Sequence, residues 1–253
     1  MTETCGRKGL EELSEEYEFC SKCPSLEASR SQVVFGSGSS TAPIVIVGEG
    51  PGAQEDEEGA VFIGDSGQLL MSMLTFEDDR VRVWPADEEL DRITRVQEDE
   101  TYFEKVRDYL DEYIFWTNAV LCRPEENRTP TAVEVKNCLD RLHRSIYAVD
   151  PILVIAAGKT AASALLGKAV AVTDKSGTLF DIGIPSPATG NMVRYPMLVV
   201  LHPSFLLREG DQKLVKRKQG KTYETIKHLA FGIRLVERLH VEMYGHSFLE
   251  KRA

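Results

Sequence analysis

Four of the five cysteines have spacings that suit metal chelation. Cys20 and Cys23 form a tight C-x2-C pair, and Cys122 and Cys138 enclose fifteen further residues. Thiolate sets of this kind hold zinc or an iron–sulfur cluster, and the spacing does not separate the two metals. Buried free cysteines are the alternative. The odd number of cysteines argues against a disulfide framework, and Cys5 is left as a spare thiol.

Three other side chains could recognise a planar base. To bind and release such a ring, a protein needs an aromatic face for stacking and an amide that reads its polar edge. It also needs a hydrogen-bond donor that stabilises the negative charge on the departing base. Phe62, Asn118 and His202 supply these chemical types, each near the end of an expected strand. Singly, they also fit a core aromatic, a helix cap and a hydrogen-bonded core histidine. Their joint occurrence favours a binding site.

Four apolar runs predict the strands that position these side chains. They are Pro43–Gly48, Tyr113–Asn118, Ile152–Ala157 and Pro196–His202. Unbroken apolar runs are typical of parallel strands that are buried on both faces. Helical patterns lie between or after them, at Ser66–Leu74, Thr131–Val149, Lys159–Leu166 and Tyr223–Tyr244. This alternation predicts an α/β fold, a three-layer α/β/α sandwich with a central four-stranded parallel sheet.

Ligands of open parallel sheets bind at the carboxyl ends of the strands, and the sequence is unusual there. Gly48, Gly50 and Gly52 after the first strand allow backbone to pass close to a ligand. They do not form a dinucleotide fingerprint, because Ala53 and Glu55 flank the place of the third glycine and an acidic run replaces the helix start. A phosphate loop at 158–160 also fails, since Leu153 stands where its first glycine belongs.

Length and composition favour one domain over residues 1–253, with 42% hydrophobic residues for its core. There is no apolar run long enough to span a membrane, and the polar N-terminus is unlike a signal peptide, so we expect a cytoplasmic protein. The net charge of −10 argues against a large non-specific nucleic-acid footprint, though not a local one. Two segments look inserted, an acidic one at about 75–112 and a basic one at about 208–222.

Three sequence blocks and the cysteine layout resemble the family 4 uracil-DNA glycosylases, the iron–sulfur class of the uracil-DNA glycosylase superfamily. The blocks are Gly48–Leu70, which begins GEGPG, Thr117–Cys138, which begins TNAVLCRP, and His202–Arg208, HPSFLLR. The resemblance covers most of the chain from Cys20 to Arg208. It implies an enzyme of base excision repair that hydrolyses the N-glycosidic bond of a flipped-out uracil and leaves an abasic site.

The resemblance also implies roles for particular residues. Phe62 would stack on uracil, Asn118 would read its polar edge and reject cytosine, and Glu55 would exclude the thymine methyl at carbon 5. His202 would stabilise the negative charge that develops on the base. Glu49 would orient water or stabilise the sugar cation, so we expect Glu49, His202 and Asn118 to be the catalytic residues.

Three further groups of residues take roles from the same resemblance. Backbone at Gly48 and Gly50 would line the base pocket. DNA would be contacted by Pro203, Ser204, Phe205, Leu206, Leu207 and Arg208, of which the last four would form the loop that enters the duplex. A [4Fe–4S] cluster would be held by Cys20, Cys23, Cys122 and Cys138.

The sequence departs from the family pattern in its acidic and basic segments. A basic protein is therefore a candidate partner for the acidic insertion, beside the main partner, uracil-containing DNA in single- or double-stranded form. We expect a monomer associated with the nucleoid. It would be monofunctional, because the strand-end motifs GEGPG, TNAVLCRP and HPSFLLR hold no lysine that could form a Schiff base. A glycosylase for a modified pyrimidine and a non-catalytic DNA- or base-binding relative stay open as alternatives.

Overall fold

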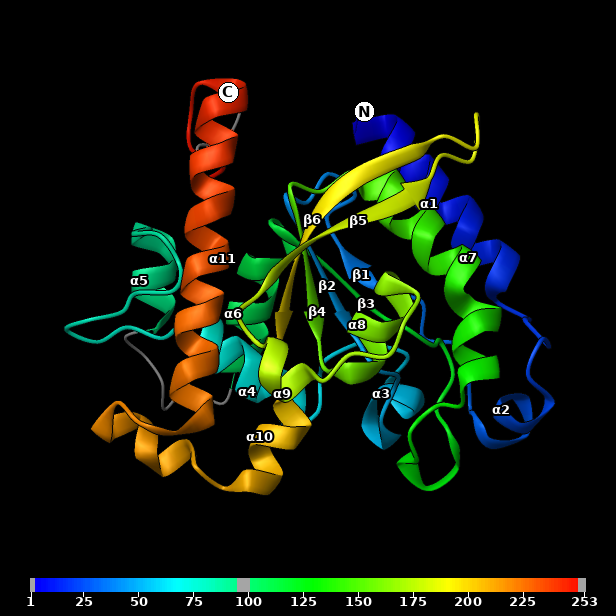
Figure 1. The fold of residues 1–253 in the computed structure, drawn as a ribbon, viewed down its shortest axis with the longest axis horizontal. Helices are drawn as coiled ribbons and strands as arrows, with labels where there is room; N and C mark the ends of the chain where they lie inside the picture. Colours follow the sequence, from blue (N-terminus) through cyan, green and yellow to red (C-terminus); the bar gives the residue numbers. More distant parts are fainter. Residues whose placement is uncertain (1–2, 95–100, 250–253) are drawn as a thin grey trace.

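The computed structural model describes residues 3–94 and 101–249, which form an α/β/α sandwich around one sheet (Figure 1). Four inner strands lie in the order β3 (Ile114–Asn118), β2 (Ile44–Gly48), β4 (Leu153–Ala157) and β6 (Met192–Val200). These four strands are parallel, as the sequence predicts. Every residue of β2, β3 and β4 is buried, which explains their unbroken apolar sequences.

The sheet has six strands, so the prediction of four was incomplete. A short strand β1 (Ser37–Gly38) pairs antiparallel with β3, and β5 (Leu179–Pro185) pairs antiparallel with β6. Strand β1 is only two residues long, and β5 alternates, with Ile182 and Ile184 buried and the residues beside them partly or fully exposed. Neither edge strand therefore carries the apolar run that marks an inner strand.

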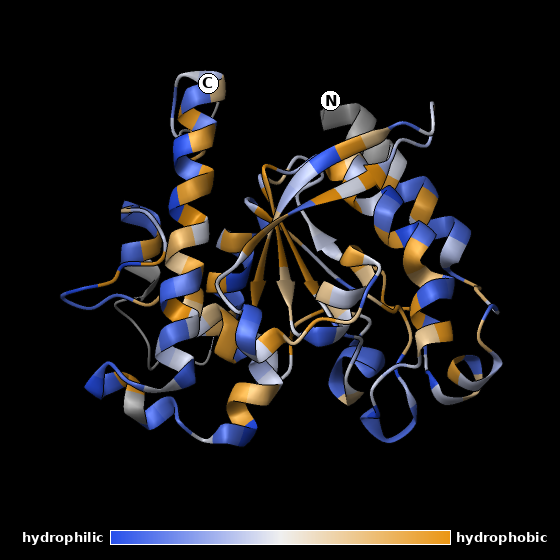
Figure 2. Ribbon diagram, in the orientation of Figure 1, coloured by the Kyte–Doolittle hydropathy of each residue, from blue (hydrophilic) through white to orange (hydrophobic). Residues whose placement is uncertain are grey.

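Helices cover both faces of this sheet (Figure 1). One face carries α4 (Asp65–Leu74), α5 (Glu88–Thr94), α6 (Tyr102–Asp111) and α11 (Gly220–Tyr244), and the other carries α1 (Glu3–Tyr17), α7 (Ala132–Val149) and α8 (Lys159–Leu166). Figure 2 shows the strands as the most hydrophobic part of the ribbon, with hydrophilic residues on the outer faces of the helices. No described helix has the length and apolar character needed to cross a bilayer.

Helix α7 begins where its sequence predicts. The Thr131 side chain accepts a hydrogen bond from the backbone of Glu134, whose carboxylate accepts one from the Thr131 backbone at 2.7 Å. This reciprocal pair satisfies two free N–H groups of the first turn. Further along α7, Arg141 donates to the carbonyl of Asn118 at the end of β3, so the helix lies against that strand end.

Part of the acidic segment at 75–112 belongs to the core, and its residues 95–100 lie outside the described structure. Helix α6 buries Val106 and Leu110. Its Arg107 donates to the carbonyl of Val61 at 2.8 Å and stacks on the ring of Trp116. Upstream of α6, Asp79 forms an ion pair with Lys218 of the basic segment. The acidic and basic segments therefore contact each other.

The smaller helices connect these layers at the carboxyl edge of the sheet. They are α2 (Pro24–Ser29), α3 (Ala53–Glu58), α9 (Val172–Lys175), α10 (Pro203–Glu209) and the 3-10 turns η1 (Glu125–Asn127) and η2 (Gln212–Arg217). Most of the side chains discussed below lie on these helices or at the strand ends beside them.

Candidate active site

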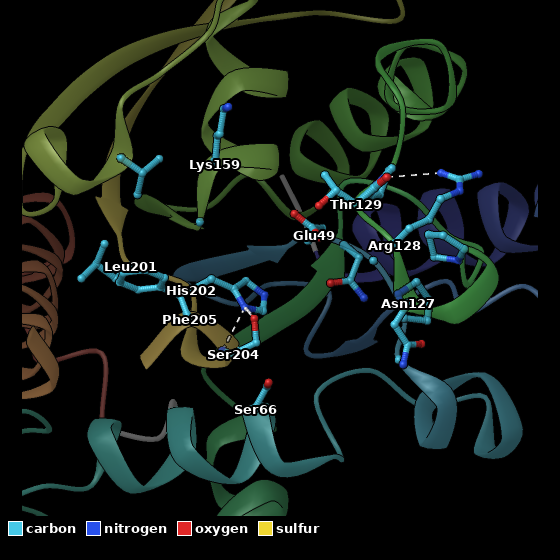
Figure 3. A pocket seen from close by; sticks show the side chains of 18 of the residues that line it. Glu49, Ser66, Asn127, Arg128, Thr129, Lys159, Leu201, His202, Ser204 and Phe205 are labelled. Atoms are coloured by element: carbon cyan, nitrogen blue, oxygen red, sulfur yellow. Dashed lines mark hydrogen bonds between the residues drawn. The ribbon is translucent and has the colours of Figure 1, made fainter. Parts of the chain in front are cut away.

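A cavity of about 690 Å³ opens at the carboxyl edge of the four parallel strands. Its walls include Glu49 and Gly50 after β2, Asn118 at the end of β3, Gly158 after β4, and His202 after β6. Figure 3 shows side chains from these strand ends gathered around one space. The cavity therefore lies where an open α/β sheet places its ligand.

Phe62 supplies an aromatic side chain to this cavity in a backbone conformation that is costly for it. Its φ is +57°, the left-handed region that non-glycine residues rarely adopt. Glu55 holds this geometry, because one of its carboxylate oxygens accepts from the Phe62 N–H at 2.6 Å and the other from the Gly52 N–H at 2.6 Å. Helix α4 packs closely against the backbone of Phe62, because a Cβ on Gly67 would collide with the Phe62 carbonyl.

Glu55 also lines the cavity, yet its carboxylate is engaged with backbone. Burial raises the pKa of Glu55, and the hydrogen bonds from Gly52, Phe62 and Ile63 oppose that rise. The observed contacts are those of a residue that positions Phe62. A role in excluding a methyl group at carbon 5 stays a prediction.

Asn118 and Phe62 share the space above Gly48. Asn118 is the register partner of Gly48 across β3 and β2. A Cβ on Gly48 would collide with the Asn118 Oδ1 and lie 2.8 Å from the Phe62 Cζ, so only glycine fits beneath the two side chains. Gly48 therefore brings the amide and the ring together.

The amide nitrogen of Asn118 is buried and unpaired. The residue is 3% exposed, and its Nδ2 has no hydrogen-bond partner among the described residues. A buried N–H group without an acceptor costs about 1–3 kcal/mol, so such groups in native proteins call for a partner. An acceptor on a bound ligand would provide one.

His202 caps helix α10 and presents a neutral imidazole. Its Nδ1 accepts from the Ser204 N–H at 3.1 Å and lies 2.8 Å from the Ser204 Oγ. Burial lowers the pKa of His202 to about 4, and the nearby Arg208 adds to this effect. Since Nδ1 is an acceptor and the ring is neutral, the hydrogen-bond pattern assigns the proton to Nε2. His202 can therefore donate one hydrogen bond without carrying a charge.

Glu49 lies on the wall of the cavity at the end of β2. One of its carboxylate oxygens accepts a hydrogen bond from the hydroxyl of Thr160, which lies in the first turn of α8. Its backbone carbonyl accepts from the Val120 N–H at 3.1 Å. The first contact holds the carboxylate and the second holds the backbone, and no hydrogen bond from the described residues reaches the other carboxylate oxygen.

The segment 203–208 is a helix, which corrects the expectation of a loop. His202 supplies the N-cap and Pro203 the first residue of α10, a favourable start for a helix. Leu206 is fully buried and packs in the core, so it cannot enter a DNA duplex while α10 is folded. Leu207 is 37% exposed and is the apolar side chain of this helix that remains available.

The cavity also has walls that the sequence analysis did not assign. Asn127, Arg128 and Thr129 line it from the loop after β3, and Arg128 is fixed by two hydrogen bonds to Glu134 of 2.7 and 2.9 Å. Lys159, placed outside the pocket motifs, lines the cavity as well. In Figure 3 its amine is directed away from His202.

The four cysteines expected to bind a cluster lie together beside α1, α2 and α7. All four are free thiols, and the thiols of Cys20 and Cys138 act electrostatically on those of both Cys23 and Cys122. The site is bordered by a small apolar cluster that contains Leu13, Tyr17, Leu26 and Leu121. Cys5 belongs to α1, but its side chain is not among those described.

Hydrogen-bond donors already point at two of these sulfur atoms. The Arg30 guanidinium lies 2.9 Å from the Cys122 Sγ, and the Asn137 amide lies 3.3 Å from the Cys23 Sγ. Burial raises the pKa of the Cys122 thiol to about 11, although Arg30 opposes this shift. Within the described structure, no three Cys, His, Asp or Glu side chains converge closely enough to hold a single metal ion.

A family model and several known proteins that resemble this chain all indicate the same protein family. A family model described as the uracil DNA glycosylase superfamily matches residues 35–227. The type-4 uracil-DNA glycosylase of Thermotoga maritima is 32% identical over 207 residues, which cover 81% of this chain and 86% of that protein. The type-4 enzyme of Pyrobaculum aerophilum is 32% identical over 200 residues, covering 79% and 85%.

A third relative spans even more of the chain. The type-4 uracil-DNA glycosylase of Archaeoglobus fulgidus is 27% identical over 231 residues, which cover 87% of this chain and 98% of that protein. The family model includes β2, β3, β4 and β6 together with the residues that form the cavity. The chain therefore belongs to the uracil DNA glycosylase superfamily, and within it to the family of type-4 uracil-DNA glycosylases.

Proposed function

We propose that this chain is an enzyme that hydrolyses the N-glycosidic bond of uracil in DNA, the first step of base excision repair. The observation that carries the proposal is the buried Nδ2 of Asn118, which has no partner in the described part of the chain and shares one cavity with the Phe62 ring and the neutral His202. Relatives that bear the name type-4 uracil-DNA glycosylase support the choice of base.

Base selection would rest on the amide of Asn118. The Nδ2 group donates and the Oδ1 atom accepts, which complements the acceptor O4 and the donor N3–H of uracil. Cytosine presents an amino donor and a ring acceptor in these places, so both hydrogen bonds would be lost. Phe62 would stack on the ring, and the carboxylate of Glu55 would lie near carbon 5 and disfavour thymine.

Bond cleavage would be assisted by two residues on the cavity wall. As the glycosidic bond breaks, negative charge develops on uracil and positive charge on the sugar. The Nε2–H of His202 would donate to the charged oxygen of the base, the type of contact that is worth about 3–4 kcal/mol in a transition state. Glu49, with one oxygen bound by Thr160, would orient the attacking water or stabilise the sugar cation.

The nucleotide must leave the duplex to reach this cavity, because its glycosidic bond is inaccessible inside the stack. Arg128, Lys159 and Arg208 line the cavity and would contact phosphates, which predicts weaker binding at higher salt. Exposed Leu207 is the candidate wedge for the space left in the stack, in place of the buried Leu206. The substrate would be uracil-containing DNA in single- or double-stranded form.

We infer that cleavage stops at the abasic site. A lyase step requires an amine that attacks the sugar, and Lys159 is the lysine that lines the cavity. Its amine is directed away from His202, where the base would be bound (Figure 3). We also propose a cytoplasmic, nucleoid-associated monomer whose acidic segment binds a basic protein.

Cys20, Cys23, Cys122 and Cys138 would hold a [4Fe–4S] cluster. Four free thiols in one apolar site, with N–H donors on two sulfur atoms, suit such a cluster. A zinc ion would instead draw its thiolates within about 4 Å of one another, given Zn–S bonds of about 2.3 Å. The cluster would tie α2 to β3 and α7 and so stabilise the wall of the cavity.

An assay of base release tests the proposal. The protein is mixed in excess with an oligonucleotide that contains one uracil, and free base and alkali-labile strand breaks are measured over time. Matched oligonucleotides carry thymine or cytosine at the same position. We expect release of uracil alone; equal release of all three bases, or of none, contradicts the proposal.

A further inference from the structure

A buried cation lies between the cysteine site and the end of β3. Arg141, on α7, is fully buried. Its guanidinium donates to the Thr117 Oγ1 at 2.9 Å and to the Asn118 carbonyl at 2.7 Å. It thus holds the backbone of the residue whose side chain would read the base.

No carboxylate balances this charge within the described part of the chain. Arg141 follows Cys138 by three residues on α7, so the two side chains lie on the same face of this helix. Burial lowers the pKa of Arg141, and the Cys138 and Cys122 thiols and the Tyr17 hydroxyl oppose that shift. Among the described residues, the Arg141 Nε has no hydrogen-bond partner. An arginine stays protonated in proteins, and a buried charge without a counter-charge is strongly unfavourable.

We propose that the occupied cysteine site is the counter-ion of Arg141, and that Arg141 transmits its occupancy to Asn118. This inference rests on the proposed function. Four thiolates give an iron–sulfur centre a net negative charge, which would balance the guanidinium from one side. From the other side the same guanidinium positions the Asn118 backbone, so loss of the centre would leave an unbalanced cation beneath the base-reading residue.

Arg30 provides a matched comparison for this role. Its guanidinium lies 2.9 Å from the Cys122 Sγ, and its side chain has no hydrogen bond to Asn118. A neutral residue at either position should therefore alter the cluster, whereas only position 141 should alter base recognition. Arg144, also on α7, pairs with Glu16 at 2.7 Å and controls for the loss of a cation from this helix.

The test compares Arg141→Met, Arg30→Met and Arg144→Met in the cluster-loaded protein. Three quantities are measured: the midpoint reduction potential, the rate of cluster loss to a chelator, and the single-turnover rate of uracil release. Removing a nearby cation should shift the potential to more negative values, since the cation stabilises the reduced cluster. Cluster loss should accelerate on the order of tenfold, the low end for losing a contact to a metal ligand.

We expect both cluster properties to change in Arg141→Met and in Arg30→Met, and neither in Arg144→Met. Uracil release should fall on the order of tenfold in Arg141→Met, a change typical of lost coupling between sites, and stay within about twofold in the other two. An unchanged potential in Arg141→Met overturns the charge pairing. A shifted potential with normal uracil release overturns the transmission to Asn118.

Arg141→Lys covers the case in which the methionine variant does not fold. It keeps the charge but loses the fork that reaches Thr117 and Asn118, so the potential should stay near the wild-type value while uracil release falls. A lysine variant with wild-type release overturns the positioning role. The measurements of potential and of cluster loss use no uracil, so they decide the charge pairing even if the wild-type protein released none and the proposed function fell.

Discussion

Replacing His202 tests how the cavity stabilises a leaving base. The Ser204 N–H bonded to Nδ1 leaves the Nε2–H of a neutral ring as the donor. In His202→Ala this single donor is lost, and loss of one such donor lowers the rate by roughly 10²–10³, or about 2.7–4 kcal/mol. His202→Gln should retain part of the rate, because its amide can still donate.

The assay is single-turnover uracil release, with binding of uracil-containing DNA measured separately. The donor acts mainly when the base carries negative charge, so binding should weaken far less than the rate falls. Ser204→Ala is the matched control, because it removes the hydroxyl but keeps the N–H that fixes the imidazole. An equal loss of rate and binding in His202→Ala would make His202 a ground-state contact or a structural residue.

The pH profile separates a neutral donor from a charged one. With a pKa of about 4, His202 is only about one thousandth protonated at pH 7. Uracil release should therefore not decline as the pH rises from 6 to 8. A decline with a midpoint near 6.5 would show that the imidazolium is the active form and would refute the reasoning.

Four further predictions concern stability, the pocket and the cluster. The pKa of His202 is lower in the folded state than in the unfolded chain, so the unfolded state takes up the proton first as the pH falls. The free energy of unfolding should therefore fall by up to about 3 kcal/mol between about pH 6.5 and pH 4. Denaturant titrations of His202→Gln should show a smaller dependence on pH. Glu55→Gln leaves one of two backbone N–H groups without its acceptor, which should slow uracil release about tenfold; an unchanged rate on uracil with new activity on thymine would instead favour a guard at carbon 5. Cys122→Ser should lower the iron content and the brown colour of the purified protein, and zinc in a colourless wild-type protein prepared without oxygen would contradict the cluster. Thr160→Val should slow single-turnover release several-fold with little change in DNA affinity, since it frees the Glu49 carboxylate; a loss of affinity alone would argue against this role.

The sequence predicted the inner sheet and the site at its edge because both depend on local patterns. Strands buried on both faces carry continuous apolar runs, and the parallel arrangement brings their carboxyl ends to one edge. Gly48 is a single-residue example: the sequence predicted a close approach of its backbone, and the side chains of Phe62 and Asn118 leave no room for a Cβ there.

Other features depend on contacts that no local pattern contains. The edge strand β5 gains its order from pairing with β6. Leu206 shares an apolar type with exposed Leu207, and only the helical phase of α10 decides which of them is buried. Arg141 resembles any charged residue of an amphipathic helix in the sequence, yet it is buried because α7 packs behind Asn118. The role of Lys159 as a wall of the cavity likewise follows from where α8 begins.

A change of base preference tests the central claim most directly. The measurement is the ratio of single-turnover release rates from uracil- and cytosine-containing oligonucleotides, for the wild-type protein and for Asn118→Asp. The carboxylate removes the Nδ2 donor and adds an acceptor, which disfavours uracil O4 and suits the cytosine amino group. We predict that the wild-type protein releases uracil alone, and that the variant loses most of this activity and gains measurable release of cytosine. A variant that keeps the wild-type rate and preference would contradict the assignment of Asn118 as the residue that reads the base.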